Sequence, residues 1–163
     1  MTGREGFEAF FRQDFPRLAL FLIKNGASGA DAQDAAQEAM TKALAAWARI
    51  DNPRAWVRTT ALRTWWKHTS WDAALNEDTP LPVHEDPTAT KEEKWEVVHL
   101  LRRLPPAQRV VAALYYDGFS TREISSMAGK TEATVRSLLR HARQRLEEMI
   151  ETSGDTETSD SDA

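Results

Sequence analysis

Residues 119–146 of the chain are FSTREISSMAGKTEATVRSLLRHARQRL, and this stretch indicates the structure of the C-terminal half. Ser120 is followed three residues later by Glu123, which is the pattern of a capping box at the start of a helix. Gly129 suits the left-handed conformation that ends many helices, and Thr131 can cap the next helix. A short helix, a tight turn and a longer helix form the helix-turn-helix pattern.

The longer helix of this stretch has two faces of different chemistry. Its apolar positions, which recur at the spacing of a buried helix face, are Val135, Leu139, Ala142 and Leu146. Arg136, Arg140 and Arg143 follow the same spacing on a separate stripe. A basic stripe alone is often a solvated surface. Together with the capping box and the glycine turn, it favours a helix that enters a DNA groove, where arginine grips phosphates or guanine edges.

The charge of the chain is unevenly distributed. The formal net charge is −4, yet residues 1–68 and 91–150 each carry three more basic than acidic residues. The acidic excess lies in residues 69–90 and 151–163, which hold five acidic residues each and neither Lys nor Arg. Charge counted by segment is the better guide to partners, and it indicates two mildly basic folded units.

Apolar residues elsewhere also recur at helical spacing, and we find no alternating strand pattern. Ser28 and Asn52 are placed to cap two further helices, with Pro53 at the first position of the second one. Pro16 is expected to kink or split the first helix. The remaining helices are predicted at about residues 6–23, 31–49, 53–68, 91–104 and 106–115.

The predicted fold class is all-α, with two small helical domains joined by a flexible acidic linker. Residues 69–90 contain three prolines, five acidic residues and little periodicity, which is typical of a linker. Two domains joined in this way are expected to move semi-independently. The predicted boundaries are a helical domain at 1–68, the linker at 69–90, a helix-turn-helix domain at 91–150 and a disordered acidic tail at 151–163.

The helix predicted at residues 53–68 interleaves basic and aromatic side chains, a composition typical of proteins that bind single-stranded or distorted nucleic acid. We expect Trp56 to lie in the core. Trp65 and Trp66 are adjacent, so only one of them easily faces inward, and the other is available to nucleic acid or a partner. On the preceding helix Asp34, Gln37 and Glu38 lie away from the apolar stripe, where plain solvation is the simpler interpretation.

Both halves resemble the extracytoplasmic-function group of sigma factors, the minimal bacterial initiation factors. In the first half, DAQDAAQEA is similar to D-A-x-D-x-x-Q-E, and PRAWVRTTA is similar to P-R-A-W-L-x-x-I-A of the region 2 domain. In the second half, LPPAQRVVAALYYDGFSTREIS and ATVRSLLRHARQRL are similar to the region 4 domain. Leu138 stands where the family usually has Arg. The ordered pair of motifs is more specific than either motif alone.

The resemblance implies three sets of contact residues. Contacts to the β′ clamp helices of core RNA polymerase are implied for Asp34, Gln37 and Glu38. Recognition and melting of the minus-ten element are implied for Asp51, Asn52, Arg54, Arg58, Arg63, Trp65, Trp66 and Lys67. Recognition of the minus-thirty-five element is implied for Lys130, Thr131, Thr134, Arg136, Ser137, Arg140, His141 and Arg143.

The resemblance also implies the partners. They are core RNA polymerase, with a second contact from the helix around residues 110–115 to the β flap, and promoter DNA. An anti-sigma protein is a further partner that the resemblance allows. The expected function is that of an alternative sigma factor that directs polymerase to specific promoters. The rival interpretation is a stand-alone helix-turn-helix regulator, which binds duplex DNA without polymerase and usually as a dimer.

Other classes of protein fit the sequence less well. The four histidines are scattered without metal-ligand spacing, and no nucleophile or phosphate-loop motif is present, so we expect neither an enzyme nor a cofactor or metal site. There is no cysteine, which excludes disulfides. No apolar run approaches the roughly 20 residues of a membrane span, and the N-terminus has no signal-peptide core. The expected location is the cytoplasm.

Overall fold

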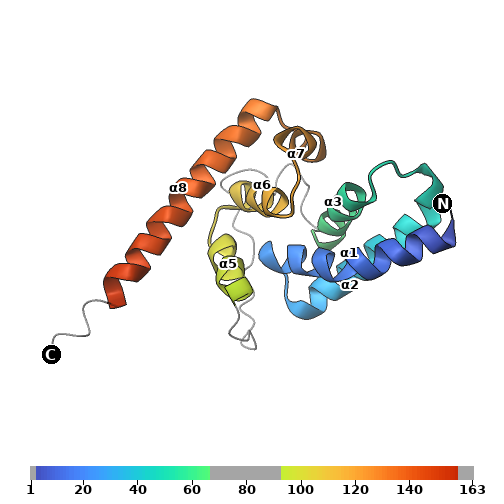
Figure 1. Cartoon of the computed structure of the whole chain (residues 1–163), viewed down its shortest axis with the longest axis horizontal. Coiled ribbons are helices and arrows are strands. Elements are labelled where there is room, and N and C mark those ends of the chain that lie inside the picture. Colours follow the sequence, from blue (N-terminus) through green and yellow to red (C-terminus); the bar gives the residue numbers. More distant parts are fainter. Residues whose placement is uncertain (1–2, 67–92, 158–163) are drawn as a thin grey trace.

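The computed structural model describes residues 3–66 and 93–157, and within them the secondary structure is helical with no strand. Figure 1 shows helices α1 to α3 as one group and α5 to α8 as a second group beside it. In chain order the elements are α1 (Arg4–Lys24), α2 (Gly29–Ala46), the 3₁₀ helix η1 (Trp47–Arg49), α3 (Pro53–Trp65), α5 (Glu93–Arg102), α6 (Pro106–Tyr116), α7 (Thr121–Ala128) and α8 (Glu132–Glu157).

The helix starts of the first half follow the predicted caps. The Ser28 side chain accepts a hydrogen bond from the backbone N–H of Asp31 at 3.1 Å, which begins α2. The Asn52 side chain accepts from the N–H of Ala55 at 3.3 Å, and Pro53 occupies the first turn of α3. Each cap satisfies a donor that the helix itself leaves unpaired, so local chemistry fixes where α2 and α3 begin.

The predicted helix-turn-helix is confirmed in its details. Ser120 and Glu123 exchange two hydrogen bonds of 3.1 Å, so the capping box is complete at the start of α7. Gly129 ends α7 with a φ of 64°, a conformation that strains any residue with a Cβ. The Thr131 hydroxyl accepts from the N–H of Thr134 at 3.1 Å and caps α8.

Two helices are longer than the sequence predicted. α1 runs through Pro16 without a break, and Leu18 and Phe21 beyond it are fully buried, which holds the second part of the helix in line. α8 continues to Glu157 rather than ending at 150. The hydroxyls of Thr152 and Ser153 bond to the carbonyls of Glu148 and Met149 at 2.8 and 2.9 Å, and adding residues to an existing helix costs little. The predicted linker at 69–90 and residues 158–163 lie outside the described residues.

The two halves are packed against each other, although the sequence predicted semi-independent domains. One continuous hydrophobic core includes Phe21 and Leu22 of α1 together with Val110 and Leu114 of α6. α1 contacts both α5 and α6, and the first half lies directly beside the second in Figure 1. α8 projects away from this junction and packs on α6 and α7 with its first half.

Candidate nucleic-acid interface

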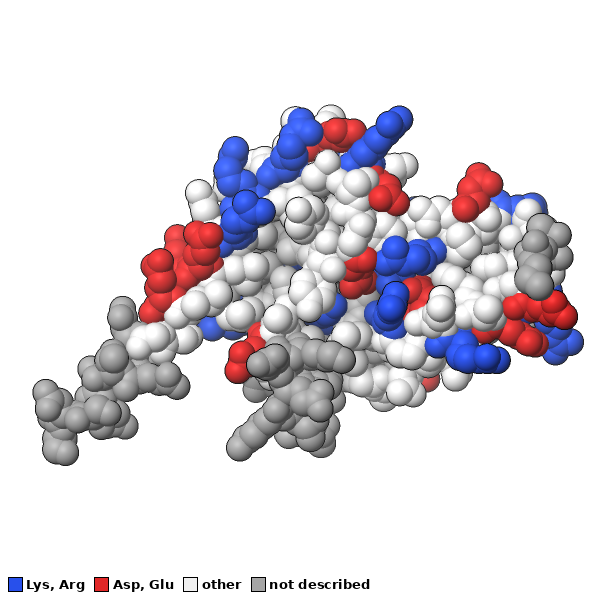
Figure 2. Space-filling view, in the orientation of Figure 1, with Lys and Arg blue, Asp and Glu red and all other residues white. Residues whose placement is uncertain are grey.

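The basic face of α8 is exposed, as the stripe of arginines predicted. Of the eight residues implied for the minus-thirty-five element, five have exposed side chains in addition to the capping Thr131, and two are half-buried. The exposed ones are Thr134, Arg136, Arg140, His141 and Arg143, and the half-buried ones are Lys130 and Ser137. Figure 2 shows Lys and Arg side chains gathered along the part of α8 nearest α7, with acidic side chains further along the helix. The structure therefore brings these residues together on one surface.

The opposite face of α8 packs against α6 and α7. Val135 and Ala142 are buried as predicted, and Leu139 and Leu146 are partly buried. Leu138, at the position where the resembled family usually has Arg, is only 8% exposed and belongs to the core. An apolar residue there extends the buried face of α8 by one position.

Arg136 has one partner of its own within α8. Its Nη1 lies 3.4 Å from Oε2 of Glu132, one turn earlier, and both side chains are largely exposed. An exposed pair of this kind contributes less than about 1 kcal/mol, so a DNA base or phosphate can replace the carboxylate at little cost. The pair holds the guanidinium near the start of α8, where recognition helices contact base edges.

The residues implied for the minus-ten element differ in how far their side chains are exposed to solvent. Asp51, Asn52 and Arg63 are exposed, and Arg54 and Trp65 are half-buried. Trp66 is buried beside Trp65, with the two ring centroids 5.6 Å apart. Trp56, predicted in the core, is partly buried against it. Lys67 lies outside the described residues.

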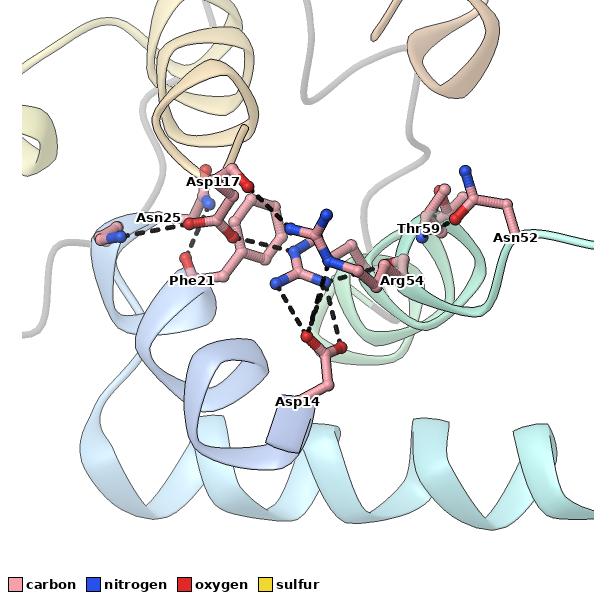
Figure 3. Close-up of polar contacts among 10 residues, drawn as sticks. Asp14, Phe21, Asn25, Asn52, Arg54, Thr59 and Asp117 are labelled. Carbon is pink, nitrogen blue, oxygen red and sulfur yellow. Dashed lines mark hydrogen bonds and ion pairs between the residues drawn. The ribbon is translucent and has the colours of Figure 1, made fainter. Parts of the chain in front are cut away.

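Arg58 is the residue that differs most from the expectation, because its side chain has no exposed area. Its Nη1 lies 3.1 Å from Oδ2 of Asp14 on α1, and its Nε donates to Oδ2 of Asp117 at 2.9 Å. Asp117 follows α6 and belongs to the second half. Figure 3 shows Asp14 and Asp117 pointing from opposite sides toward the arginine side chains of α3. In this arrangement Arg58 joins the two halves and does not lie on a surface that DNA can reach.

Further cations surround the same carboxylate. Lys24 Nζ lies 3.4 Å from Oδ1 of Asp117, and Arg54 Nη2 donates to the main-chain carbonyl of Asp117 at 2.7 Å. Burial lowers the pKa of the Lys24 ammonium, and the charge of Asp117 opposes that shift. Asp14, Lys24 and Asp117 are not among the residues predicted from the sequence. A local pattern gives no signal for them, because their partners are distant along the chain.

The polar face of α2 lies on the surface. Asp34 and Gln37 are exposed, and Glu38 is half-buried with Oε1 3.3 Å from Nζ of Lys42. The buried side of the same helix consists of alanines and a methionine, namely Ala32, Ala35, Ala36, Ala39, Met40 and Ala43. None of the three polar residues belongs to this buried side, so they form an accessible polar face of α2.

A groove of about 290 Å³ lies between α5, α6 and α8. It is lined mainly by apolar side chains, and the half-exposed Tyr115 and Tyr116 are on its α6 wall. The basic Arg143 of α8 stands at its edge. Val110, Val111 and Leu114 of the same helix are buried in the core and hold α6 in place. Of the predicted flap-contacting helix, the two tyrosines are therefore the residues that a partner can reach.

The described residues contain no group of three or more side chains placed to hold a metal ion. None of the helices in residues 3–66 and 93–157 is long and apolar enough to cross a membrane.

Comparison with known proteins identifies both halves. Residues 10–70 match the family model of Sigma-70 region 2, and residues 94–146 match that of Sigma-70, region 4. The chain is 30% identical over 127 residues to the RNA polymerase sigma-E factor of Streptomyces coelicolor, covering 74% of this chain and 72% of that protein. It is also 30% identical, over 129 residues, to the sigma-E factors of Streptomyces antibioticus and Streptomyces avermitilis, covering 75% of this chain and 72% of each.

A solved structure has the same fold over nearly the whole chain. It is the sigma factor RpoE of Bartonella quintana in complex with the anti-sigma factor NepR, with a TM-score of 0.69 and 21% sequence identity. The match covers 91% of this chain and 98% of that one. The two region models in order, the sigma-E relatives and the helix-turn-helix geometry agree, and the stand-alone regulator is not favoured. The chain belongs to the extracytoplasmic-function group of the sigma-70 family, the alternative sigma factors that bind core RNA polymerase and direct it to promoters.

Proposed function

We propose that this sigma factor reads the minus-thirty-five element with α8, the minus-ten element with the exposed part of α3 and the loop before it, and binds polymerase through α2. The observation that carries the proposal is the separation of the two faces of α8. Arg136 and Arg140 are exposed, whereas Val135 and Ala142 are buried. A helix anchored on one side and basic on the other, after a capped turn, is the element that enters a major groove.

For the minus-ten element, Arg63 and Trp65 are the contact residues that the structure supports best. Arg63 is exposed and Trp65 is half-buried, so a cation and an aromatic ring are both accessible at the C-terminal end of α3. A base stacks on an aromatic ring while a neighbouring cation neutralises the phosphate. Asp51 and Asn52 are exposed in the loop before α3, where an unpaired base has access.

For polymerase, Asp34, Gln37 and Glu38 are the proposed contacts to the β′ clamp helices. They form one polar strip on α2, and Glu38 and Lys42 make an exposed ion pair that a partner can rearrange. The groove at Tyr115 and Tyr116 is the proposed docking site for the β flap. The two contacts come from different halves, so both halves bind the same enzyme.

The protein acts as an initiation factor, and the catalytic step of RNA synthesis belongs to the polymerase. We place it in the cytoplasm, because its polymerase and its promoters are there. The structural similarity to a sigma factor in complex with an anti-sigma factor supports regulation of this chain by a protein of that class.

Run-off transcription with core RNA polymerase, this protein and a library of genomic fragments tests the function. We expect discrete transcripts that require both the protein and polymerase. A stand-alone regulator would instead shift duplex DNA without polymerase and give no polymerase-dependent start sites. That result would overturn the proposal.

A further inference from the structure

The turn after α6 packs against α3, and we call residues 117–119 the α6–α7 corner. Asp117 bonds to Arg58 and Lys24, as described above. Phe119 is almost fully buried and packs against two arginines of α3. Its ring centroid lies 4.8 Å from Cζ of Arg54 and 5.3 Å from Cζ of Arg58. Gly118 between them has a φ of 94°, which lets the chain direct both side chains toward the first half.

The corner covers two of the arginines that the family resemblance implies for the minus-ten element. Arg54 and Arg58 are engaged by Asp117 and Phe119. Nearby, Asn52 Nδ2 donates to Oε2 of Glu123 at 3.5 Å, so the loop before α3 touches the start of α7. The part of region 2 that is to face the minus-ten DNA is therefore partly occupied by region 4.

In this closed arrangement the two regions proposed to bind DNA are too close together to reach both promoter elements. The two elements are centred about 25 base pairs apart, which at 3.4 Å per base pair is about 85 Å along the duplex. In the structure, the proposed minus-ten loop and the helix-turn-helix are in hydrogen-bond contact between Asn52 and Glu123. The halves must separate before one molecule can engage both elements.

The balance of charge indicates what replaces Asp117 when the halves separate. In the closed form Lys24, Arg54 and Arg58 surround the two carboxylates of Asp14 and Asp117. Removal of Asp117 leaves three cations with one carboxylate. A DNA phosphate supplies the same kind of acceptor, because arginine binds carboxylate and phosphate oxygens with similar hydrogen bonds.

We propose that Asp117 is an intramolecular latch: its carboxylate occupies an anion site of Lys24 and Arg58 on region 2, keeps the free protein closed, and competes with the backbone of promoter DNA for that site. The proposal rests on the proposed function for the identity of the competing anion. The latch itself, a closed free protein that opens when Asp117 is neutralised, does not depend on it.

The first experiment measures the distance between the halves in the full free chain. The sequence has no cysteine, so Ala9→Cys on α1 and Glu151→Cys on α8, both at exposed positions, accept a pair of spin labels selectively. We expect a single narrow distance distribution for the otherwise unchanged protein, and a longer and broader one for Asp117→Asn. Glu5→Gln, which removes one exposed carboxylate from α1, is the charge-matched control and should leave the distribution unchanged.

The second experiment measures binding of a fluorescent single-stranded oligonucleotide of about 16 nucleotides without polymerase. Asp117→Asn should bind about tenfold more tightly than the parent, whereas Glu5→Gln should gain less than about twofold from the same change in net charge. Lys24→Gln is the second variant, because Lys24 bonds Asp117 and lies outside the residues implied by the resemblance for the minus-ten element. It should open the protein in the distance experiment.

The outcomes separate the latch from the proposed function. An unchanged distance distribution in Asp117→Asn and Lys24→Gln overturns the latch, even if run-off transcription succeeds. Opening without tighter oligonucleotide binding overturns the competition with DNA. Loss of the helical circular dichroism signal in both variants would show that the protein unfolds instead of opening, because the two halves share one core that cannot be separated. That result also overturns the latch. Failure of transcription by the parent holoenzyme, with opening intact, counts against the proposed function alone.

Discussion

Arg109 of α6 donates from Nη1 to the main-chain carbonyl of Asn25 at 2.7 Å, which joins the second half to the end of α1. Its Nε and Nη2 bond the carbonyl of Leu104 at 3.3 and 3.0 Å. The side chain is buried, and this burial, together with the charge of Arg102, lowers its pKa to about 10. The guanidinium is therefore a structural donor group and is unavailable to DNA.

Replacement of Arg109 should destabilise the protein strongly. Arg109→Leu leaves the carbonyls of Asn25 and Leu104 without these donors, and hydrogen bonds to a charged group contribute about 1.5–3 kcal/mol. We expect the free energy of unfolding in urea to fall by about 3 kcal/mol. Arg103→Leu, at an exposed position in the same segment, is the matched control and should change it by less than about 0.5 kcal/mol. Equal effects of the two variants would contradict this role for Arg109.

Removal of the acidic residues of α2 should weaken polymerase binding without unfolding the helix. Asp34→Ala/Glu38→Ala should reduce affinity for core polymerase at least about tenfold, or about 1.4 kcal/mol, with little change in melting temperature, because neither side chain packs in the core. Fluorescence anisotropy of the labelled protein measures the affinity. Glu5→Ala/Glu8→Ala, which removes two exposed acidic residues from α1, should bind like the parent. A large loss of melting temperature in the α2 variant would instead assign the face a structural role.

The capping box should make stability depend on pH in the acidic range. Hydrogen bonds from Ser120 lower the pKa of Glu123 below its ordinary value of 4.5. The unfolded chain therefore binds a proton more readily than the folded one, and the stabilisation is present above pH 4.5 and lost as the pH falls through the folded pKa. The glutamine of Glu123→Gln does not titrate. The difference in free energy of unfolding between the parent and this variant should therefore shrink below pH 4.5.

Urea unfolding from pH 7 to pH 3 measures this difference. Glu147→Gln, at an exposed position on α8, is the control for loss of a carboxylate outside the cap. A constant difference between the parent and Glu123→Gln over the whole range would show that the charge of Glu123 contributes nothing to the cap.

Local chemistry explains why so much of the helical structure could be predicted. The caps at Ser28, Asn52 and Ser120 and the left-handed Gly129 each depend on residues within a few positions of one another. Such signals can be recognised in a sequence, because the spacing of the residues identifies the donor and the acceptor of each hydrogen bond. The exposed arginines of α8 follow from the same periodicity, which assigns one stripe to the core and the other to solvent.

The packing of the halves could not be predicted for the converse reason. Arg58 and Asp117 are 59 positions apart, and no local pattern pairs one arginine with one distant aspartate. The basic and aromatic composition of residues 53–68 and the family resemblance both predict a DNA contact for Arg58, because neither indicates the two carboxylates that bury it. The extension of α8 to Glu157 was missed because the acidic composition of residues 151–163 favours disorder, whereas a preformed helix can continue through polar residues.

Arg136 and Arg145 should respond differently to substitution, because they lie at different distances from the start of α8. Arg136 is in the first turns, where a recognition helix contacts base edges. Arg136→Ala should cost about 1–3 kcal/mol of promoter binding and relax the preference at one base position of the minus-thirty-five element. Arg145 lies beside Arg103, away from the helix start, where a phosphate contact is expected. Arg145→Ala should weaken binding to all sequences and reduce the salt dependence by about one counterion.

Binding of reconstituted holoenzyme to matched and mutated minus-thirty-five elements, at several salt concentrations, measures both quantities. Glu132→Gln is a useful third variant, because it removes the carboxylate that pairs with Arg136 and leaves the arginine in place. If that carboxylate competes with DNA for the guanidinium, Glu132→Gln should bind more tightly while keeping the base preference of the parent. If Arg136→Ala leaves both affinity and base preference unchanged, the arginine stripe of α8 is a solvated surface and its assignment to the major groove is wrong.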